Sequence, residues 1–241
     1  MRYIIEENFL IAPRVFRLRL RGGTESIAAP GQFLQLQVPG FFLRRPLSIC
    51  DWDQGSVTVI YKVVGEGTQA LSALKAGGEL DALPGLGNGF DLKAPWQRPL
   101  LVGGGAGVPP LYGLAKRLVQ RGVQPTAVMG FNRREEIFLR EEFAALGVPV
   151  LLATADGSEG VRGFVTDAIA GLRDYDGFYA CGPEPMLRAV ADACPCPGQL
   201  SFEERMACGF GACMGCSCQT KYGQKRICKD GPVLWKEEVI W

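Results

Sequence analysis

One segment of the chain carries the strongest indication of its fold: Leu100-Leu101-Val102-Gly103-Gly104-Gly105-Ala106-Gly107-Val108-Pro109-Pro110-Leu111. It contains a short apolar run, a glycine-rich turn and the start of a stretch, 111–119, that has the apolar spacing of a helix. Glycines in such a turn let the backbone approach a pyrophosphate, which then sits against the helix N-terminus. A purely structural turn is the alternative, but the strand–turn–helix context favours a nucleotide site.

Segments of the same kind follow toward the C-terminus. The candidate strands are 127–129, 150–153 and 178–180, and the candidate helices are 135–146, 165–172 and 184–193. This alternation predicts a parallel, doubly wound sheet, so we expect residues 97–200 to form an α/β nucleotide-binding domain. Ligands of such sheets bind at the carboxyl ends of the strands, which places Cys181 and Gly182 near a bound nucleotide. The start of the next helix explains this Cys-Gly-Pro motif equally well.

Residues 1–96 have a β pattern instead. Alternating or β-branched apolar residues at 17–20, 34–38 and 56–63 are separated by turns rich in glycine and proline. Short strands at this spacing predict an antiparallel barrel or sandwich, and the barrel is the fold we expect.

Two motifs in this β-rich part suit phosphate groups. In Arg45-Pro46-Leu47-Ser48 the arginine can pair with a phosphate while Ser48 donates to a ring nitrogen, although taken by itself the motif is better explained as an exposed strand edge. Gly65-Glu66-Gly67-Thr68 opens a helical stretch and offers N–H groups and a hydroxyl to an anion. Two phosphate sites in one small barrel suggest a dinucleotide such as FAD rather than FMN.

Residues 201–241 form a separate, cysteine-rich segment. Five of the nine cysteines fall between Cys208 and Cys228, and an odd count in a chain without a signal peptide favours metal or redox chemistry over disulfides. Cys208, Cys213 and Cys216 stand at gaps of four and two residues, and the fourth cysteine, Cys228, follows. This is the plant-type 2Fe–2S spacing. The small residues between the cysteines allow a tight loop whose N–H groups can point at sulfur.

A four-cysteine structural zinc site is the alternative for this cluster. Such sites usually pair their ligands as two C-x2-C units, whereas here only Cys213 and Cys216 form such a unit. Cys218 breaks the iron–sulfur spacing, and we therefore expect it not to be a ligand. The segment is too short to bury a core of its own, so a bound inorganic centre is expected to organise it.

Composition excludes several classes of protein. The 241 residues include no histidine, which removes imidazole-based triads, His-ligated zinc and Rieske clusters. With 26 basic and 25 acidic side chains, the chain lacks the positive charge that nucleic-acid binding requires. It also lacks a signal-type apolar region near its start and any run of 18 apolar residues, so we expect a soluble, cytoplasmic protein without membrane contact.

The combination of sites points to electron transfer. A nicotinamide exchanges two electrons as hydride, an iron–sulfur cluster passes one at a time, and a flavin converts between the two modes. Hydride transfer needs no acid–base side chain, so no catalytic residue is assigned. The chain shows no machinery for an organic substrate, and we infer that a separate protein exchanges electrons with the cluster.

The motifs, taken in order along the chain, resemble the ferredoxin–NADP reductase superfamily. The segments Glu204-Arg205-Met206-Ala207-Cys208 and Cys228-Lys229-Asp230-Gly231-Pro232-Val233 narrow the resemblance to the electron-transfer subunits of class 1B dihydroorotate dehydrogenases. It covers essentially the whole chain. It implies an FAD-binding barrel at 1–96, a nicotinamide-nucleotide domain at 97–200 and a 2Fe–2S lobe at 201–241.

The resemblance also implies a role for each motif. Arg45, next to Pro46, would contact an FAD phosphate, Leu47 and Ser48 would flank the isoalloxazine, and the Gly65 turn with Gly67 and Thr68 would hold the pyrophosphate. The pyridine nucleotide would face Gly104, Gly105 and Gly107, with Cys181 and Gly182 near nicotinamide. Iron would be held by Cys208, Cys213, Cys216 and Cys228. The implied partner is an FMN-containing catalytic subunit in a heterotetramer of two plus two, with electrons running from FMN through 2Fe–2S and FAD to NAD+ in pyrimidine biosynthesis.

Two other functions stay open. One is a flavin/iron–sulfur subunit of a ferredoxin:NADP+ transhydrogenase or sulfhydrogenase, although some of these replace one cluster cysteine by aspartate and this chain keeps four. The other is a zinc-stabilised nucleotide-binding scaffold. Only the resemblance favours NAD over NADP. Arg133 and Arg134 follow the second strand of the nucleotide domain, where they could meet a 2′-phosphate or could simply belong to a solvated loop, so they do not decide the question.

Overall fold

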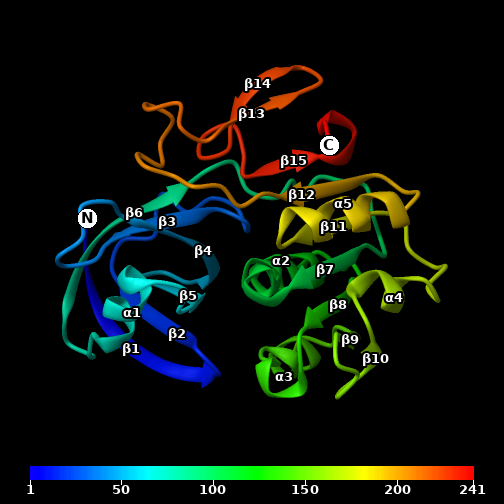
Figure 1. Cartoon of the computed structure of the whole chain (residues 1–241), viewed down its shortest axis with the longest axis horizontal. Helices are drawn as coiled ribbons and strands as arrows, with labels where there is room; N and C mark the ends of the chain where they lie inside the picture. Colours follow the sequence, from blue (N-terminus) through cyan, green and yellow to red (C-terminus); the bar gives the residue numbers. More distant parts are fainter.

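Six antiparallel strands close into a barrel at the N-terminal end of the computed structural model, which describes residues 1–241 (Figure 1). The strands run in the order β1-β2-β5-β4-β3-β6, and the barrel is filled by fully buried leucines such as Leu18, Leu20, Leu34 and Leu36. The expected barrel is confirmed. Its elements are β1 (Arg2–Ala12), β2 (Val15–Arg21), β3 (Phe33–Gln37), β4 (Arg45–Trp52), β5 (Ser56–Lys62), α1 (Glu66–Ala73) and β6 (Glu79–Leu86).

The central part of the chain forms the predicted α/β domain. Its sheet has the order β10-β9-β8-β7-β11-β12-β15, in which every neighbouring pair is parallel except the last. The strands are β7 (Leu100–Gly104), β8 (Thr126–Phe131), β9 (Val150–Thr154), β10 (Val161–Arg162), β11 (Phe178–Cys181), β12 (Gly198–Ser201) and β15 (Val233–Trp235). The helices are α2 (Val108–Gln120), α3 (Arg140–Ala145), α4 (Val165–Ile169) and α5 (Glu184–Ala193), with short 3-10 turns at Gly105–Gly107, Arg134–Glu136 and Lys236–Glu238.

One predicted helix is interrupted. The apolar spacing over 135–146 predicts a continuous helix, but Leu139 has a left-handed backbone with φ of 64°. A residue with this backbone cannot continue a right-handed helix, so only Arg140–Ala145 forms α3 and a 3-10 turn precedes it. Leu139 is buried, and packing of its side chain overrides the local helical preference.

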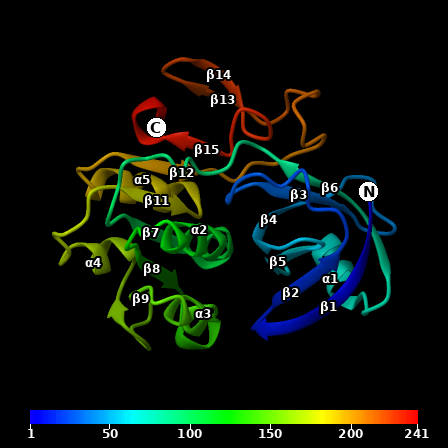
Figure 2. The same ribbon diagram turned by 180° about the vertical axis from the view of Figure 1, so that it is seen from behind.

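The cysteine-rich segment lies across both other parts. It contains a hairpin, β13 (Ser217–Thr220) and β14 (Gly223–Arg226), and ends in β15, which joins the sheet antiparallel to β12. Figure 2 shows this segment, in orange and red, above the barrel and the sheet together. Cys216, Ile227 and Cys228 share one buried cluster with Phe33 of the barrel and Leu200 of the sheet. The buried residues of this segment are therefore part of a core that it shares with the barrel and the sheet.

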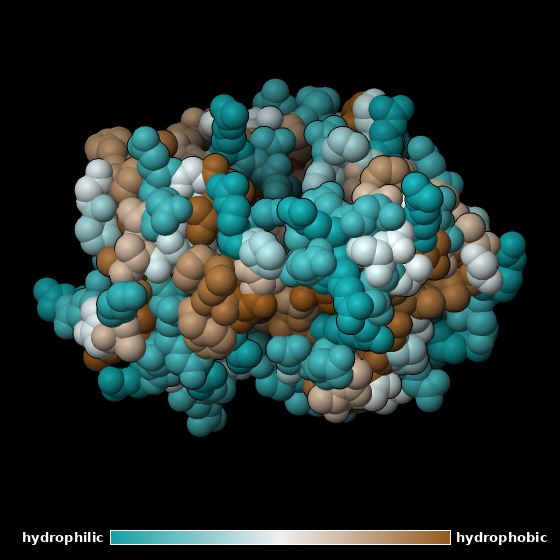
Figure 3. Space-filling view, turned by 60° about the horizontal axis from the view of Figure 1, so that its bottom comes forward, coloured by the Kyte–Doolittle hydropathy of each residue, from teal (hydrophilic) through white to brown (hydrophobic).

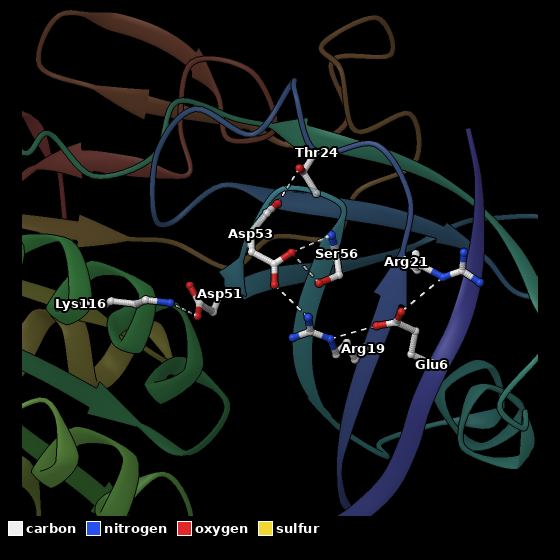
Figure 4. A network of polar contacts seen from close by, with 8 residues as sticks. All are labelled: Glu6, Arg19, Arg21, Thr24, Asp51, Asp53, Ser56 and Lys116. Atoms are coloured by element: carbon white, nitrogen blue, oxygen red, sulfur yellow. Dashed lines mark hydrogen bonds and ion pairs between the residues drawn. The ribbon is translucent and has the colours of Figure 1, made fainter.

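The barrel and the α/β domain meet where α2 packs on β4. A Cβ placed on Gly113 of α2 would lie 2.5 Å from the carbonyl oxygen of Cys50, so only glycine permits this approach. Lys116 Nζ contacts Asp51 Oδ2 at 2.7 Å, next to a barrel network in which Arg19 links Glu6 and Asp53 (Figure 4). The Arg117 guanidinium lies 3.3 Å from the ring centre of Trp52.

The face in Figure 3 shows brown, apolar side chains along the middle of the molecule, where the two halves meet. A cavity of about 320 Å³ at this junction is lined by residues of both halves, including Ile11, Ile60 and Phe138. None of the helices combines the length and the apolar character that a membrane-spanning helix needs.

Candidate functional site

The two phosphate motifs of the barrel come together in space. Arg45 is the first residue of β4, and its guanidinium lies against the first turn of α1, where a Cβ on Gly67 would overlap it. Arg45 donates to the carbonyl of Leu43 and lies 4.8 Å from the ring centre of Phe41, but no carboxylate pairs with it. A cation beside a helix N-terminus is an arrangement suited to an anion.

The Thr68 hydroxyl is hydrogen-bonded within the Gly65 turn and is not free to donate to an anion. It accepts the N–H groups of Val64 and Gly65 at 3.0 and 3.2 Å and donates to the carbonyl of Gly65 at 2.9 Å. The threonine thereby holds the Gly65 turn in shape and presents Gly67 to Arg45. Pro46, Leu47 and Ser48 are half-buried on β4, where the Ser48 hydroxyl has no hydrogen-bond partner within the chain.

The glycine-rich turn and the Cys-Gly motif also meet. Cys181 ends β11 in register with Gly103 of β7, and a Cβ on Gly107 would overlap the Cys181 carbonyl. Gly104 and Gly182 both pack on Met186 of α5, a residue that the sequence reasoning missed. Gly105, with φ of 49°, has open space beside it. The carboxyl edge of the sheet is thus lined by bare backbone.

The Cys181 thiol does not contribute a charge at this edge. The side chain is buried, and this burial raises its pKa to about 12. The thiol is therefore protonated at neutral pH. A cavity of about 670 Å³ lies at the other end of the sheet, where Leu100 and Thr126 begin their strands, and is separate from these motifs.

The two arginines after β8 are both paired with acids. Arg133 Nε lies 3.4 Å from Glu136 Oε1, and Arg134 Nε lies 3.7 Å from Glu159 Oε2. Both arginine side chains are well exposed, so these pairs are weak. Glutamates next to this loop disfavour a second phosphate there.

The four candidate iron ligands lie two by two. Cys208 Sγ accepts the N–H of Cys213 at 3.4 Å, and Cys216 Sγ accepts the N–H of Cys228 at 3.3 Å. A 2Fe–2S cluster takes two protein ligands on each iron, and two close pairs of cysteines would suit such ligation.

Backbone groups favour the thiolate at the first cysteine. Burial raises the pKa of Cys208, but the N–H groups of Cys213, Phe210 and Ala212 outweigh it and lower the pKa to about 6. A thiolate is the form that binds iron. Cys218 lies on the β13 hairpin opposite Lys225, and burial raises its pKa.

An ion pair that the sequence reasoning missed braces the cysteine loop. Arg226 Nε contacts Asp230 Oδ2 at 2.9 Å, and Arg226 Nη1 donates to the carbonyl of Gly211 at 3.0 Å. These contacts connect the Cys228 segment to the loop between Cys208 and Cys213. The i, i+4 spacing of an arginine and an aspartate on either side of Cys228 was the available signal.

Two segments match known protein families. Residues 203–240 match the family described as the iron–sulfur cluster binding domain of dihydroorotate dehydrogenase B. Residues 101–192 match the oxidoreductase NAD-binding domain. The two matches fall on the cysteine-rich segment and on the α/β domain.

Curated relatives match over almost the whole length. The dihydroorotate dehydrogenase B (NAD(+)) electron transfer subunit of Bacillus caldolyticus is 46% identical, covering 99% of this chain and 98% of that protein. The subunits of the same name from Fusobacterium nucleatum and Listeria innocua are 42% and 44% identical, with coverage of both chains at 94% or more.

Solved structures give the same architecture. A chain from the structure of the NADH-dependent reduced ferredoxin–NADP oxidoreductase, described in connection with flavin-based electron bifurcation, superimposes with a TM-score of 0.91 at 32% identity, covering 99% of this chain and 90% of that one. Phthalate dioxygenase reductase, at 20% identity and a TM-score of 0.68 over 80% of this chain and 63% of that one, shares the fold.

Proposed function

The chain belongs to the family of dihydroorotate dehydrogenase B electron-transfer subunits, and from this premise we propose that it carries electrons from an FMN-containing catalytic subunit through a 2Fe–2S cluster and FAD to NAD+. It is an oxidoreductase subunit with an iron–sulfur-binding segment and an NAD-binding domain. Dihydroorotate is oxidised on the partner, in pyrimidine biosynthesis.

One observation carries the proposed order of the cofactors. Phe33 of β3 packs in the same buried cluster as Cys216 and Cys228, and its partner in register on β4 is Ser48 of the flavin motif. The flavin motif therefore pairs with a strand whose Phe33 belongs to the same core that buries Cys216 and Cys228. Such proximity supports direct electron exchange between the cysteine site and the flavin motif.

The barrel supplies the binding groups for FAD. When bound, the flavin would accept or release electrons singly or in pairs. Arg45, which has no carboxylate partner, would pair with a phosphate, and the Gly65–Thr68 turn would leave backbone room beside it. Leu47 and Ser48 would border the ring, with the free Ser48 hydroxyl available as a donor.

The carboxyl edge of the sheet supplies the site for NAD. Gly104, Gly105 and Gly107 would admit the nucleotide to the backbone at the start of α2, and Cys181 with Gly182 would lie near nicotinamide. The neutral Cys181 thiol keeps this edge free of negative charge. The curated relatives are NAD(+) subunits by name, which supports NAD over NADP.

The cysteine loop also supports docking of the catalytic subunit. Phe210 and Met214, which lie between the proposed ligands, are 55% and 50% exposed. Exposed apolar side chains beside a redox centre suit a protein partner rather than water. We propose an assembly of two copies of each subunit.

The test is a chemical and kinetic analysis of one anaerobically purified sample. Iron, acid-labile sulfide and FAD should be present at two irons and one flavin per chain. Adding the purified catalytic subunit should produce dihydroorotate-dependent reduction of NAD+. Iron and flavin without that activity, but with turnover of ferredoxin, would instead favour a function like that of the NADH-dependent reduced ferredoxin–NADP oxidoreductase, whose chain superimposes with a TM-score of 0.91. A colourless, zinc-containing preparation would contradict both.

A further inference from the structure

Three buried glutamines of this chain differ in how their amides are satisfied. The Gln32 amide accepts from the N–H groups of Ala28 and Ala29 and donates to the carbonyls of Gly85 and Gly87. The Gln199 amide accepts the Asp91 N–H at 2.8 Å and donates to the Asp91 carbonyl at 3.1 Å. Both are structural links between loops and strands.

Gln35 has neither kind of partner. Its side chain is completely buried, and both its nitrogen and its oxygen lack a hydrogen bond within the chain. A buried polar group without a partner costs stability, because it has lost its bonds to water and gained none. An apolar side chain of the same shape would remove this cost, so the amide needs a function or a ligand.

The position of Gln35 identifies that ligand. The end of its side chain lies directly against Gly209, where a Cβ would overlap the amide nitrogen. Gly209 follows Cys208 and has φ of 77°, so its lack of a side chain leaves the amide beside the cysteine loop. On the other side, Gln35 is in register with Pro46 of β4.

We propose that the amide N–H of Gln35 donates to sulfur at the Cys208 side of the iron–sulfur site and raises the reduction potential of the cluster. The inference rests on the proposed function, since it requires the cluster to be present. A reduced cluster carries one more negative charge than an oxidised one. An N–H group aimed at its sulfur therefore stabilises the reduced form more.

The decisive experiment compares the reduction midpoint of the cluster in wild-type protein and Gln35→Met, followed by visible circular dichroism and electron paramagnetic resonance. Methionine has a similar length and no N–H group. At the wild-type midpoint, the ratio of reduced to oxidised cluster should fall about tenfold, which corresponds to 59 mV for a one-electron couple.

Gln199→Met is the matched control. It removes a satisfied amide from the α/β domain, so it should lower thermal stability and leave the midpoint unchanged. Gln35→Met should be at least as thermally stable as wild type, because methionine leaves no buried polar group without a partner. If Gln35→Met loses its iron, Gln35→Asn, which keeps the amide but withdraws it from Gly209, should still shift the midpoint to more negative values.

The outcomes separate this inference from the proposed function. Wild-type protein without iron would overturn the proposed function. Wild-type protein with a cluster, together with an unchanged midpoint and unchanged spectra in the Gln35 variants, would overturn the inference alone. Loss of stability in Gln35→Met without a redox shift would assign Gln35 a purely structural role.

Discussion

At the scale of single residues, two neighbouring arginines have opposite environments. Arg44 contacts Asp81 at 2.7 Å and also donates to its backbone carbonyl. Arg45, one position later, lies against Gly67 with no acidic partner. Arg44 lies just before β4 and Arg45 is its first residue, so adjacent residues of identical chemistry can have a structural role in one case and a ligand-binding role in the other.

Replacing Arg45 by alanine should weaken FAD retention by about 1.5–3 kcal/mol, the contribution of one charge-assisted contact. This corresponds to a loss of affinity of about ten- to a hundredfold. Flavin content after extensive dialysis measures the effect. Arg44→Ala is the matched control and should retain its FAD at the wild-type level. Equal flavin retention in the two variants would contradict the assignment of Arg45 to the flavin site.

Replacing Cys213 by serine should lower the iron content, because it removes one of two thiols from the Cys208–Cys213 pair. It should also weaken docking of the catalytic subunit while the barrel stays folded. Cys218→Ser is the control, since Cys218 lies on the hairpin opposite Lys225 and is not expected to bind iron. Iron analysis and far-UV circular dichroism check both variants. Full iron occupancy in Cys213→Ser would contradict the ligand assignment.

At the scale of elements, the approach of α2 to β4 sets the relation between the barrel and the nucleotide domain. Gly113 brings the helix backbone to the Cys50 carbonyl, and Lys116 and Arg117 extend the contact to Asp51 and Trp52. The same helix begins at the glycine-rich turn. Its position therefore fixes the distance between the flavin motif and the nucleotide edge.

Gly113→Ala should force the two elements apart. A Cβ at 2.5 Å from a backbone oxygen is overpacking without a flexible neighbour to absorb it, which costs about 1–3 kcal/mol. The melting temperature should fall by about 2–4 °C per kcal/mol in a chain of this size. Gly171→Ala, with open space at its Cβ, is the control and should be neutral. Equal melting temperatures in Gly113→Ala and wild type would show that the α2–β4 contact accommodates the added methyl group without loss of stability.

At the scale of the whole molecule, the cysteine-rich segment joins the other two parts. Cys216 and Cys228 share a core with β3 and β12, and the last strand of the segment completes the sheet. Between Met206 and Cys216, however, the chain has no helix or strand. The loop around the cluster site is therefore held mainly by its sulfurs and by the Arg226 contacts.

Removal of iron by acid and chelator should loosen this loop without unfolding the molecule. Amide hydrogen exchange should accelerate across residues 203–230 and stay slow in β3 and β12, because those strands keep their own ladder bonds. Exchange mass spectrometry of iron-loaded and iron-free protein measures this. Uniform acceleration over the barrel would contradict it and would make the cluster a requirement for the whole fold.

Much of the architecture is readable from the chain because its signals are local. The glycine turn after Val102, the cysteine spacing from Cys208 to Cys216 and the helix at Glu184 depend on residues a few positions apart, whose geometry follows from backbone sterics and periodicity. The prediction of a continuous helix over 135–146 is wrong for the opposite reason. Burial of Leu139, a tertiary effect, breaks a locally favourable pattern.

Contacts between distant segments needed the folded molecule. No spacing rule shows that Arg45 rather than Arg44 meets Gly67, that Val233–Trp235 closes the sheet, or that Gln35 lies unpartnered beneath Gly209. Each depends on how whole strands and loops pack, since a side chain's burial and partners are set by neighbours far away in the chain. Local chemistry determined which groups are available for electron transfer, and packing determined which of them face one another.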